Sequence, residues 1–224
     1  MKYINDLSPP VIVLTGTLNP SIFNPSWVAQ HIFGYEEGAV LNFYQAVYPL
    51  GDELRQLIVL DGVGWSVTRN RCEIFVTSLE PDIVERAEGF AVKVVQTLPH
   101  TPWGSAGVNF QFSADGDVDD LLEKYQTPEG FEGGFNVGNQ TLSVALAIAA
   151  NLTLNVQRNV GADFSVFFNN HNDDLNAENA EQLLVGSILP SLERCRSIMT
   201  EQFDMDEEVQ HFLNPQAGEV VNVG

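Results

Sequence analysis

Apolar residues occupy every second position between residues 142 and 156. They are Leu142, Val144, Leu146, Ile148, Ala150, Leu152, Leu154 and Val156. A period of two predicts β-structure with one buried face. The pattern fits either one long strand or two strands that keep the same phase. After a predicted turn over residues 159–162, Phe164, Val166 and Phe168 continue the alternation on the expected partner strand.

A helical pattern covers residues 81–98 and opens on Pro81, a residue that suits the first helical position. Apolar side chains recur there at i, i+3, i+4 and i+7, which predicts a helix with one apolar face. A second long helix is expected over residues 177–203, with Asn176 as its N-cap. Pro190 is expected to kink this helix or to split it.

Shorter signals complete the predicted fold. Residues 63–67 and 72–76 flank Arg69-Asn70 as a hairpin with a tight turn. Further strands are expected over residues 11–13, 39–48, 57–60 and 108–112, and short helices from Pro25 or Ser26 to Ile32 and over residues 118–125. Because hairpin-linked strands occur in groups with helices between the groups, we expect an α+β fold. A mainly antiparallel sheet would be packed by the two longer helices.

One α+β domain is expected over residues 1–203. The glycine-rich stretch 126–140 is the candidate internal boundary, and residues 204–224 are expected to form an acidic, poorly ordered tail. The first ten residues lack a signal-peptide core. The longest nearly apolar stretch, 142–150, has about half the length of a membrane span. These features predict a cytoplasmic protein.

The charge is strongly negative and unevenly spread. Thirty acidic residues against ten basic ones give a formal charge of −20. Residues 1–100 carry a net −5 and residues 101–224 a net −15. Such a charge disfavours direct binding to nucleic acid or to anionic membranes and favours a protein partner with a basic surface. Self-association, and adaptation to a high-salt environment, stay open as further explanations.

No complete catalytic or metal-binding motif is present, so no catalytic residue, metal or cofactor is expected. Asp115, Asp117 and Asp119 are spaced like the first ligands of a calcium loop. Asp120, however, stands where that loop needs glycine, and Gln126 where it needs glutamate. Two distant cysteines, Cys72 and Cys195, are expected to be buried thiols. The candidate interaction residues are Trp27, Trp103, Asp115, Asp117, Asp119, Asp120, Asp204, Asp206, Glu207 and Glu208.

Two proline-containing stretches carry a resemblance. They are Asn19-Pro20-Ser21-Ile22-Phe23-Asn24-Pro25-Ser26-Trp27, and His100-Thr101-Pro102 followed by Gly107-Val108-Asn109. With these, the chain resembles a family of uncharacterised bacterial proteins with N-P-x-I-F-x-P-x-W and H-T-P…G-I-N stretches. The chain departs from the family by Val108 in place of isoleucine and by a longer, more acidic second half. No activity is known for that family, so the resemblance implies no catalytic residue.

These observations favour a non-catalytic protein-interaction or assembly subunit with an acidic surface. Two alternatives belong to other classes. One is an enzyme or metal-dependent protein whose site is assembled from distant residues, with His100 or His171 beside carboxylates. The other is an acidic mimic of nucleic acid that inhibits a DNA-binding protein.

Overall fold

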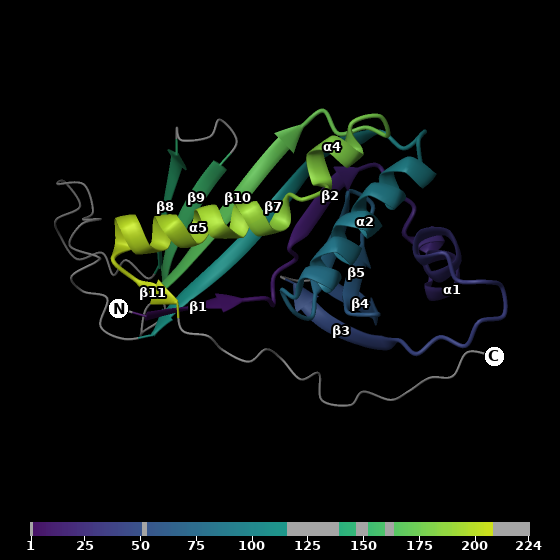
Figure 1. Ribbon diagram of the computed structural model, residues 1–224, viewed down its shortest axis with the longest axis horizontal. Helices are drawn as coiled ribbons and strands as arrows, with labels where there is room; N and C mark the ends of the chain where they lie inside the picture. Colours follow the sequence, from purple (N-terminus) through teal and green to yellow (C-terminus); the bar gives the residue numbers. More distant parts are fainter. Residues whose placement is uncertain (1, 51–52, 116–138, 147–151, 160–163, 208–224) are drawn as a thin grey trace.

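The computed structural model describes residues 2–50, 53–115, 139–146, 152–159 and 164–207, and within them the strands form one eleven-stranded sheet (Figure 1). The strand order is β3-β4-β5-β6-β2-β7-β10-β9-β8, and β1 pairs with both β7 and β11. All of these pairs are antiparallel except β1 with β11. The predicted α+β fold with a mainly antiparallel sheet is therefore confirmed.

The described part of the chain contains the following strands and helices. The strands are β1 (Lys2–Asp6), β2 (Ile12–Gly16), β3 (Tyr44–Leu50), β4 (Glu53–Leu60), β5 (Val63–Val67), β6 (Arg71–Val76), β7 (Trp103–Asp115), β8 (Asn139–Leu146), β9 (Leu152–Asn159), β10 (Phe164–Asp173) and β11 (Asp206–Glu207). The helices are η1 (Pro20–Ile22), α1 (Pro25–Val28), η2 (Ala29–Phe33), α2 (Pro81–Thr97), α4 (Ala180–Leu184) and α5 (Ile188–Phe203). None of the helices in this part of the chain has the length and apolar character needed to cross a bilayer.

The long strand β7 organises the sheet. β10 pairs with it along one edge, whereas β2 and β1 share its other edge, one after the other. Pro9 and Pro10 lie between β1 and β2. Proline has no N–H to donate to a strand ladder, so the pairing is interrupted there. The sequence pattern did not predict β1.

The alternating stretch of residues 142–156 belongs to two strands rather than one. β8 and β9 pair antiparallel with Leu142 opposite Val156 and Val144 opposite Leu154. This register places the apolar positions of both strands on the same face of the sheet. The second of the two predicted alternatives, two strands that keep the same phase, therefore holds. Residues 147–151 lie outside the described part of the chain.

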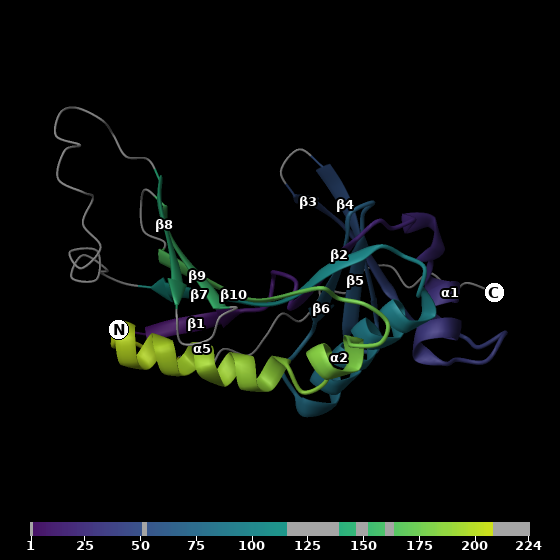
Figure 2. The same ribbon diagram turned by 90° about the horizontal axis from the view of Figure 1, so that it is seen from above.

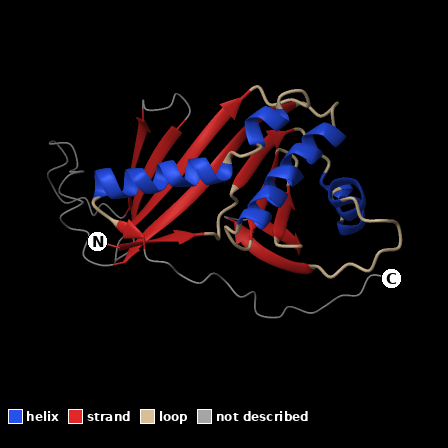
Figure 3. Ribbon diagram, in the orientation of Figure 1, coloured by secondary structure: helices blue, strands red, loops and turns tan. Residues whose placement is uncertain are grey.

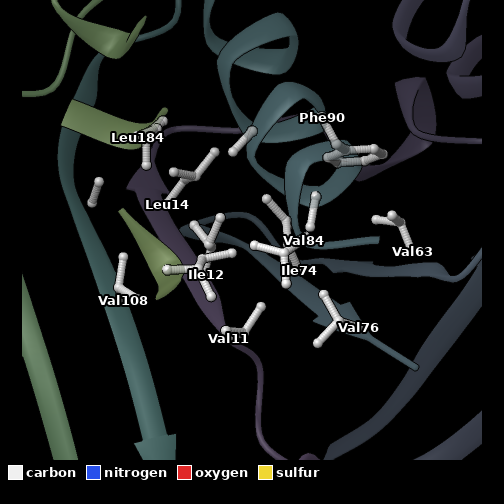
Figure 4. Packing of buried hydrophobic residues seen from close by; sticks show 14 of the residues in the cluster. Val11, Ile12, Leu14, Val63, Ile74, Val76, Val84, Phe90, Val108 and Leu184 are labelled. Carbon is white, nitrogen blue, oxygen red and sulfur yellow. The ribbon is translucent and has the colours of Figure 1, made fainter. Parts of the chain in front are cut away.

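The helices α2 and α5 cover the same face of the sheet (Figures 2 and 3). α2 packs on β5 and β6, and α5 packs on β7. Figure 4 shows Ile12 and Leu14 of β2 in the middle of the packed side chains, with Val84 and Phe90 of α2 above the sheet. Ile12 and Leu14 are completely buried. The opposite face of the sheet carries no helix among the described residues.

The expected helix over residues 177–203 is two helices, α4 and α5. Gly186 lies in the break with φ +67°, a left-handed conformation that favours glycine. Pro190 is the third residue of α5, within the first turn, where proline costs no intrahelical hydrogen bond. Asn176 caps the turn before α4, because its Oδ1 accepts the amide hydrogens of Glu178 and Asn179 at 2.9 and 3.1 Å.

A buried carboxylate joins the two longer helices. Glu88 of α2 is 5% exposed, and its oxygens accept hydrogen bonds from Gly186 N at 2.7 Å and Ile188 N at 2.8 Å. The side chain of the N-cap residue of α5, Ser187, makes no capping bond. Glu88 therefore caps α5 from another helix and places a negative charge at its positive end.

Two structural features lie in the stretch where the predicted tail begins. Met205 is completely buried, and Asp206–Glu207 form β11. Residues 208–224 lie outside the described part of the chain. The predicted helix over residues 118–125 and most of the glycine-rich stretch also lie outside it, although Asn139 and Gln140 belong to β8.

Candidate interaction site

The two candidate tryptophans support local structure. Trp27 in α1 is half-buried, and its ring lies 5.5 Å from that of Phe23 and 5.1 Å from that of His31, centroid to centroid. Trp103 at the start of β7 is also half-buried and donates its indole N–H to Leu98 O at 3.2 Å. Both side chains are thus anchored by neighbours close in sequence, and neither is among the strongly exposed apolar side chains.

The two proline-containing loops lie at the same end of the sheet. Thr17 N donates to Pro102 O at 3.2 Å, which joins the chain after β2 to the chain before β7. This proximity follows from the antiparallel pairing of β2 with β7. The stretches that carry the family resemblance are therefore neighbours in space.

Several candidate acidic residues meet near the N-terminus of the chain. Asp115 on β7 and Asp206 on β11 are both register partners of Lys2 on β1. Glu207 forms an ion pair with Arg196 of α5, with Oε2 2.8 Å from Nε and Oε1 accepting from Nη2 at 2.9 Å. We call the positions Asp115, Asp204, Asp206 and Glu207 the acidic end.

The acidic end is built from both the sheet and α5. Asp204 is exposed and ends α5 with φ +56°. The remaining candidates, Asp117, Asp119, Asp120 and Glu208, lie outside the described residues. The structure thus brings together two acidic groups, Asp115 and Asp206, that are about ninety positions apart in sequence.

The strand β3 has an exposed and uncharged edge that the sequence analysis missed. β3 is the terminal strand of the main sheet path, and β4 is the only described strand with which it pairs. Residues 38–51 contain no charged side chain, in a chain of which 18% is charged. Tyr44 is 44% exposed and Val47 62% exposed, and Val40 just before the strand is 79% exposed. The absence of charge was visible in the sequence, but its meaning depends on the position of β3 at an edge.

Edge strands of monomeric proteins are normally protected against pairing with other chains. Charged side chains, bulges or a covering loop supply that protection. In β3 the only such device in the sequence is Pro49, which removes one backbone donor. Among the described strands none pairs with the outer edge of β3, so its backbone groups are free to pair with an added strand.

Groups suited to catalysis are dispersed in the described chain. His171 on β10 lies 3.0 Å from Asp173 Oδ1 but faces solvent, and His100 is exposed in the turn after α2. Within the described ranges, no three histidine, cysteine or acidic side chains gather as metal ligands would. The structure gives the alternative of an enzyme or metal-dependent protein no assembled site in this part of the chain.

Both cysteines are buried and free. Burial raises the pKa of the Cys195 thiol to about 12, although the nearby Arg194 opposes the change. Burial raises the pKa of Cys72 further, and the charge of Glu73 adds to this effect. Both side chains therefore remain protonated thiols at neutral pH and are poor nucleophiles.

No protein-family model matches the chain, and no curated protein is similar to it in sequence. The chemistry and geometry of the chain itself therefore carry any functional assignment.

Proposed function

We propose that this protein is a non-catalytic interaction or assembly subunit, and that its β3 edge accepts an extended strand of a protein partner with a basic surface. The observation that carries the proposal is the uncharged outer edge of β3, where Tyr44 and Val47 are exposed beside backbone groups that no described strand pairs with. Backbone hydrogen bonds to such an edge supply affinity, and side chains on alternate positions supply specificity.

The charge of the whole chain supports a basic partner rather than a second copy. Two molecules of charge −20 repel each other at long range, whereas a basic protein is attracted and steered to the surface. The β3 edge itself is neutral, so no charged side chain of the protein loses hydration where the strands meet. The acidic end lies beside β1 and β11, apart from β3, and adds to the long-range attraction (Figures 1 and 2).

The cytoplasm is the compartment that we propose for this function. Cys72 and Cys195 are unpaired thiols in separate elements, as in a reducing compartment.

The proposal is tested by isolating the natural partner and mapping where it binds. Partners retained by the native protein would be identified by mass spectrometry, and a purified basic candidate would then be added back. We expect slowed hydrogen exchange of β3 amides in the complex, and a Kd that rises with salt. Light scattering of the protein alone is expected to give a monomer.

Charge placed on the edge is expected to break the complex. Val47→Lys sets an ammonium group against a basic partner, and we expect it to weaken binding by more than about tenfold, or about 1.4 kcal/mol. Val185→Lys is the matched control, because Val185 is similarly exposed at 57% but lies after α4, away from β3. Equal effects of the two variants, protection outside β3, or dimerisation of the protein alone through β3 would contradict the proposal.

A further inference from the structure

A hollow of about 350 Å³ lies between α2, the end of η2 and the turn that joins β4 to β5. Phe33 of η2 and Phe90 of α2 form its aromatic side, with ring centroids 5.6 Å apart. Trp65 of β5 supports them from the core, stacked on Phe90 at 5.7 Å with an interplanar angle of 30°. The aromatic side is therefore held by a buried cluster and does not depend on a ligand for its position.

Hydrogen bonds position the polar side of the hollow. The Tyr35 hydroxyl donates to the carboxylate of Asp61, and Arg86 Nη1 donates to Asp61 O at 2.6 Å. The hydrogen bond to Asp61 raises the pKa of Tyr35, and burial and the carboxylate charge add to the rise. Tyr35 therefore stays protonated at neutral pH and keeps Asp61 in place.

Two positive charges line the same hollow. Arg86 and Lys93 are seven residues apart on α2, so two helical turns bring them to one face. Lys93 is exposed and has neither an ion pair nor a hydrogen bond among the described residues. With the carboxylate of Asp61, the three charged side chains of the hollow sum to one positive charge, although the chain as a whole carries −20.

Gly89 leaves the middle of this helix face open. It lies in the interior of α2, where glycine costs about 1 kcal/mol relative to alanine. Its φ is not left-handed, and a Cβ added to it would meet no atom within 4 Å. Neither backbone conformation nor packing within the protein requires glycine here. Because Gly89 lines the hollow between Arg86 and Lys93, a side chain at this position would enter the open space.

We propose that the hollow binds a small aromatic monocarboxylate, with its ring against Phe33 and Phe90 and its carboxylate at Lys93 and Arg86. The aromatic side favours a planar apolar group. One net positive charge attracts a dianion about twice as strongly as a monoanion, whereas the cost of desolvating the ion rises with the square of its charge, so a monoanion is favoured over a phosphate dianion. The volume lies at the low end of the range for small-molecule sites, which favours a ligand of one or two rings. This site is separate from the β3 edge.

The test uses titrations of the full-length protein with benzoate, phenylacetate and 3-phenylpropionate, followed by amide NMR shifts and by calorimetry. At least one carboxylate is expected to bind at millimolar concentration or below and to shift amides of α2 and of residues 33–35. Phenylacetamide, which lacks the charge, is expected to bind about tenfold more weakly than phenylacetate. Phenyl phosphate is expected to bind no more tightly than phenylacetate.

Variants separate charge from space. Lys93→Gln is expected to weaken carboxylate binding about tenfold, whereas Arg69→Gln, which alters an exposed arginine on the β5–β6 turn, is expected to leave it unchanged. Gly89→Leu is expected to abolish binding because it fills the hollow, and circular dichroism checks that the helix is retained. If Gly89→Leu fails to fold, the effects of Lys93→Gln and of phenylacetamide decide whether the carboxylate site exists.

Three results would overturn the proposal. They are no binding of any of the three carboxylates, binding that is unaffected by Lys93→Gln, and tighter binding of phenyl phosphate than of phenylacetate. Loss of carboxylate binding in Val47→Lys would also contradict it, because that variant alters a different surface. The proposed interaction function can fail without affecting any of these outcomes.

Discussion

The two longer helices are attached to the sheet in different ways. α2 lies on β5 and β6 through apolar side chains, and Trp65, Phe90 and Phe33 form a continuous aromatic cluster beneath it. α5 also buries an apolar stripe, but polar contacts fix its start, its first turn and its middle. These contacts are Glu88 to Gly186 N and Ile188 N, Asn170 Nδ2 to Ser191 Oγ at 3.0 Å, and Arg196 to Glu207.

This difference has a consequence for cooperativity. Apolar packing is non-directional and tolerates small shifts, whereas a buried polar contact is either satisfied or costs free energy. The α2 region, which we define as β5, β6 and α2, should therefore lose stability gradually on substitution. The α5 region, defined as β1, β11 and α5, should respond sharply to the loss of single polar groups.

The largest effect is expected for Glu88→Ala. Removal of the carboxylate leaves the buried amide of Ile188 and the amide of the exposed Gly186 without their acceptor, at a cost of about 3 kcal/mol in the free energy of unfolding. Urea unfolding measures this loss, and hydrogen exchange should show that α5 amides lose more protection than β5 and β6 amides. Glu85→Ala, an exposed glutamate of the same helix, is the control and should change stability by less than about 0.5 kcal/mol. Equal losses of stability in the two variants would show that the Glu88 carboxylate does not hold α5 to α2.

A smaller loss is expected for Gly62→Ala in the β4–β5 turn, which lies against Ile83 of the α2 region. Gly62 has φ +81°, and a Cβ there would lie 2.5 Å from Ile83 Cδ1, so backbone strain and crowding should cost about 2 kcal/mol. Gly38→Ala isolates the strain, because Gly38 has a similar φ of +84° and open space around its Cβ position. In thermal or urea unfolding, the free energy of unfolding of Gly62→Ala should be about 1 kcal/mol lower than that of Gly38→Ala. The same stability for both would show that Ile83 moves aside without cost.

The cysteines offer one reporter in each region. Their folded pKa values lie above the ordinary value of about 9, so above pH 9 the unfolded chain releases thiol protons that the folded chain retains. Stability is therefore unaffected below pH 9 and falls as pH rises toward the folded pKa values. At pH 10 each thiol should remove about 1.4 kcal/mol.

Replacement of each thiol measures its share. Cys72→Ala and Cys195→Ala should each reduce the loss of stability between pH 8 and pH 10 by about 1.4 kcal/mol, in urea unfolding at both pH values. If the two regions unfold together, the two replacements act on one transition. A separate earlier transition affected by Cys195→Ala alone would show that the α5 region unfolds independently. An unchanged pH dependence in both variants would contradict the burial argument.

The same contrast explains which parts of the fold the sequence could predict. The apolar stripe of α2 and the period-two strands β8 and β9 follow from local spacing, and both were predicted. The start of α5 depends on Glu88, about one hundred positions away, and local spacing contains no sign of it. β1 was missed because Pro9-Pro10 separate it from β2 and its partners lie in distant strands.

The candidate interaction sites show a similar limit. The charge asymmetry indicated an acidic region, and the structure places Asp115 and Asp206 on the two strands that pair with β1. The uncharged stretch of residues 38–51 indicates a binding edge only because β3 lies at the edge of the sheet. Gly89 likewise reads as an ordinary helical residue until the open space beside it is known. Edges and hollows are properties of topology, and no local pattern encodes them.

The smallest expected effect is a gain from Asp204→Gly at the end of α5. Asp204 adopts φ +56° and places a negative charge at the negative end of the helix, so glycine should relieve both costs and add about 1 kcal/mol to stability. Asp174→Gly is the matched control, because Asp174 has φ +62° but does not end a helix. Urea unfolding should show the larger gain in stability for Asp204→Gly. Asp204→Asn, which removes the charge but keeps a side chain, should give only the part of that gain that comes from the charge. If Asp204→Gly gains no more than Asp174→Gly, the helix charge is unimportant, and the end of α5 is less sensitive to polar changes than its start.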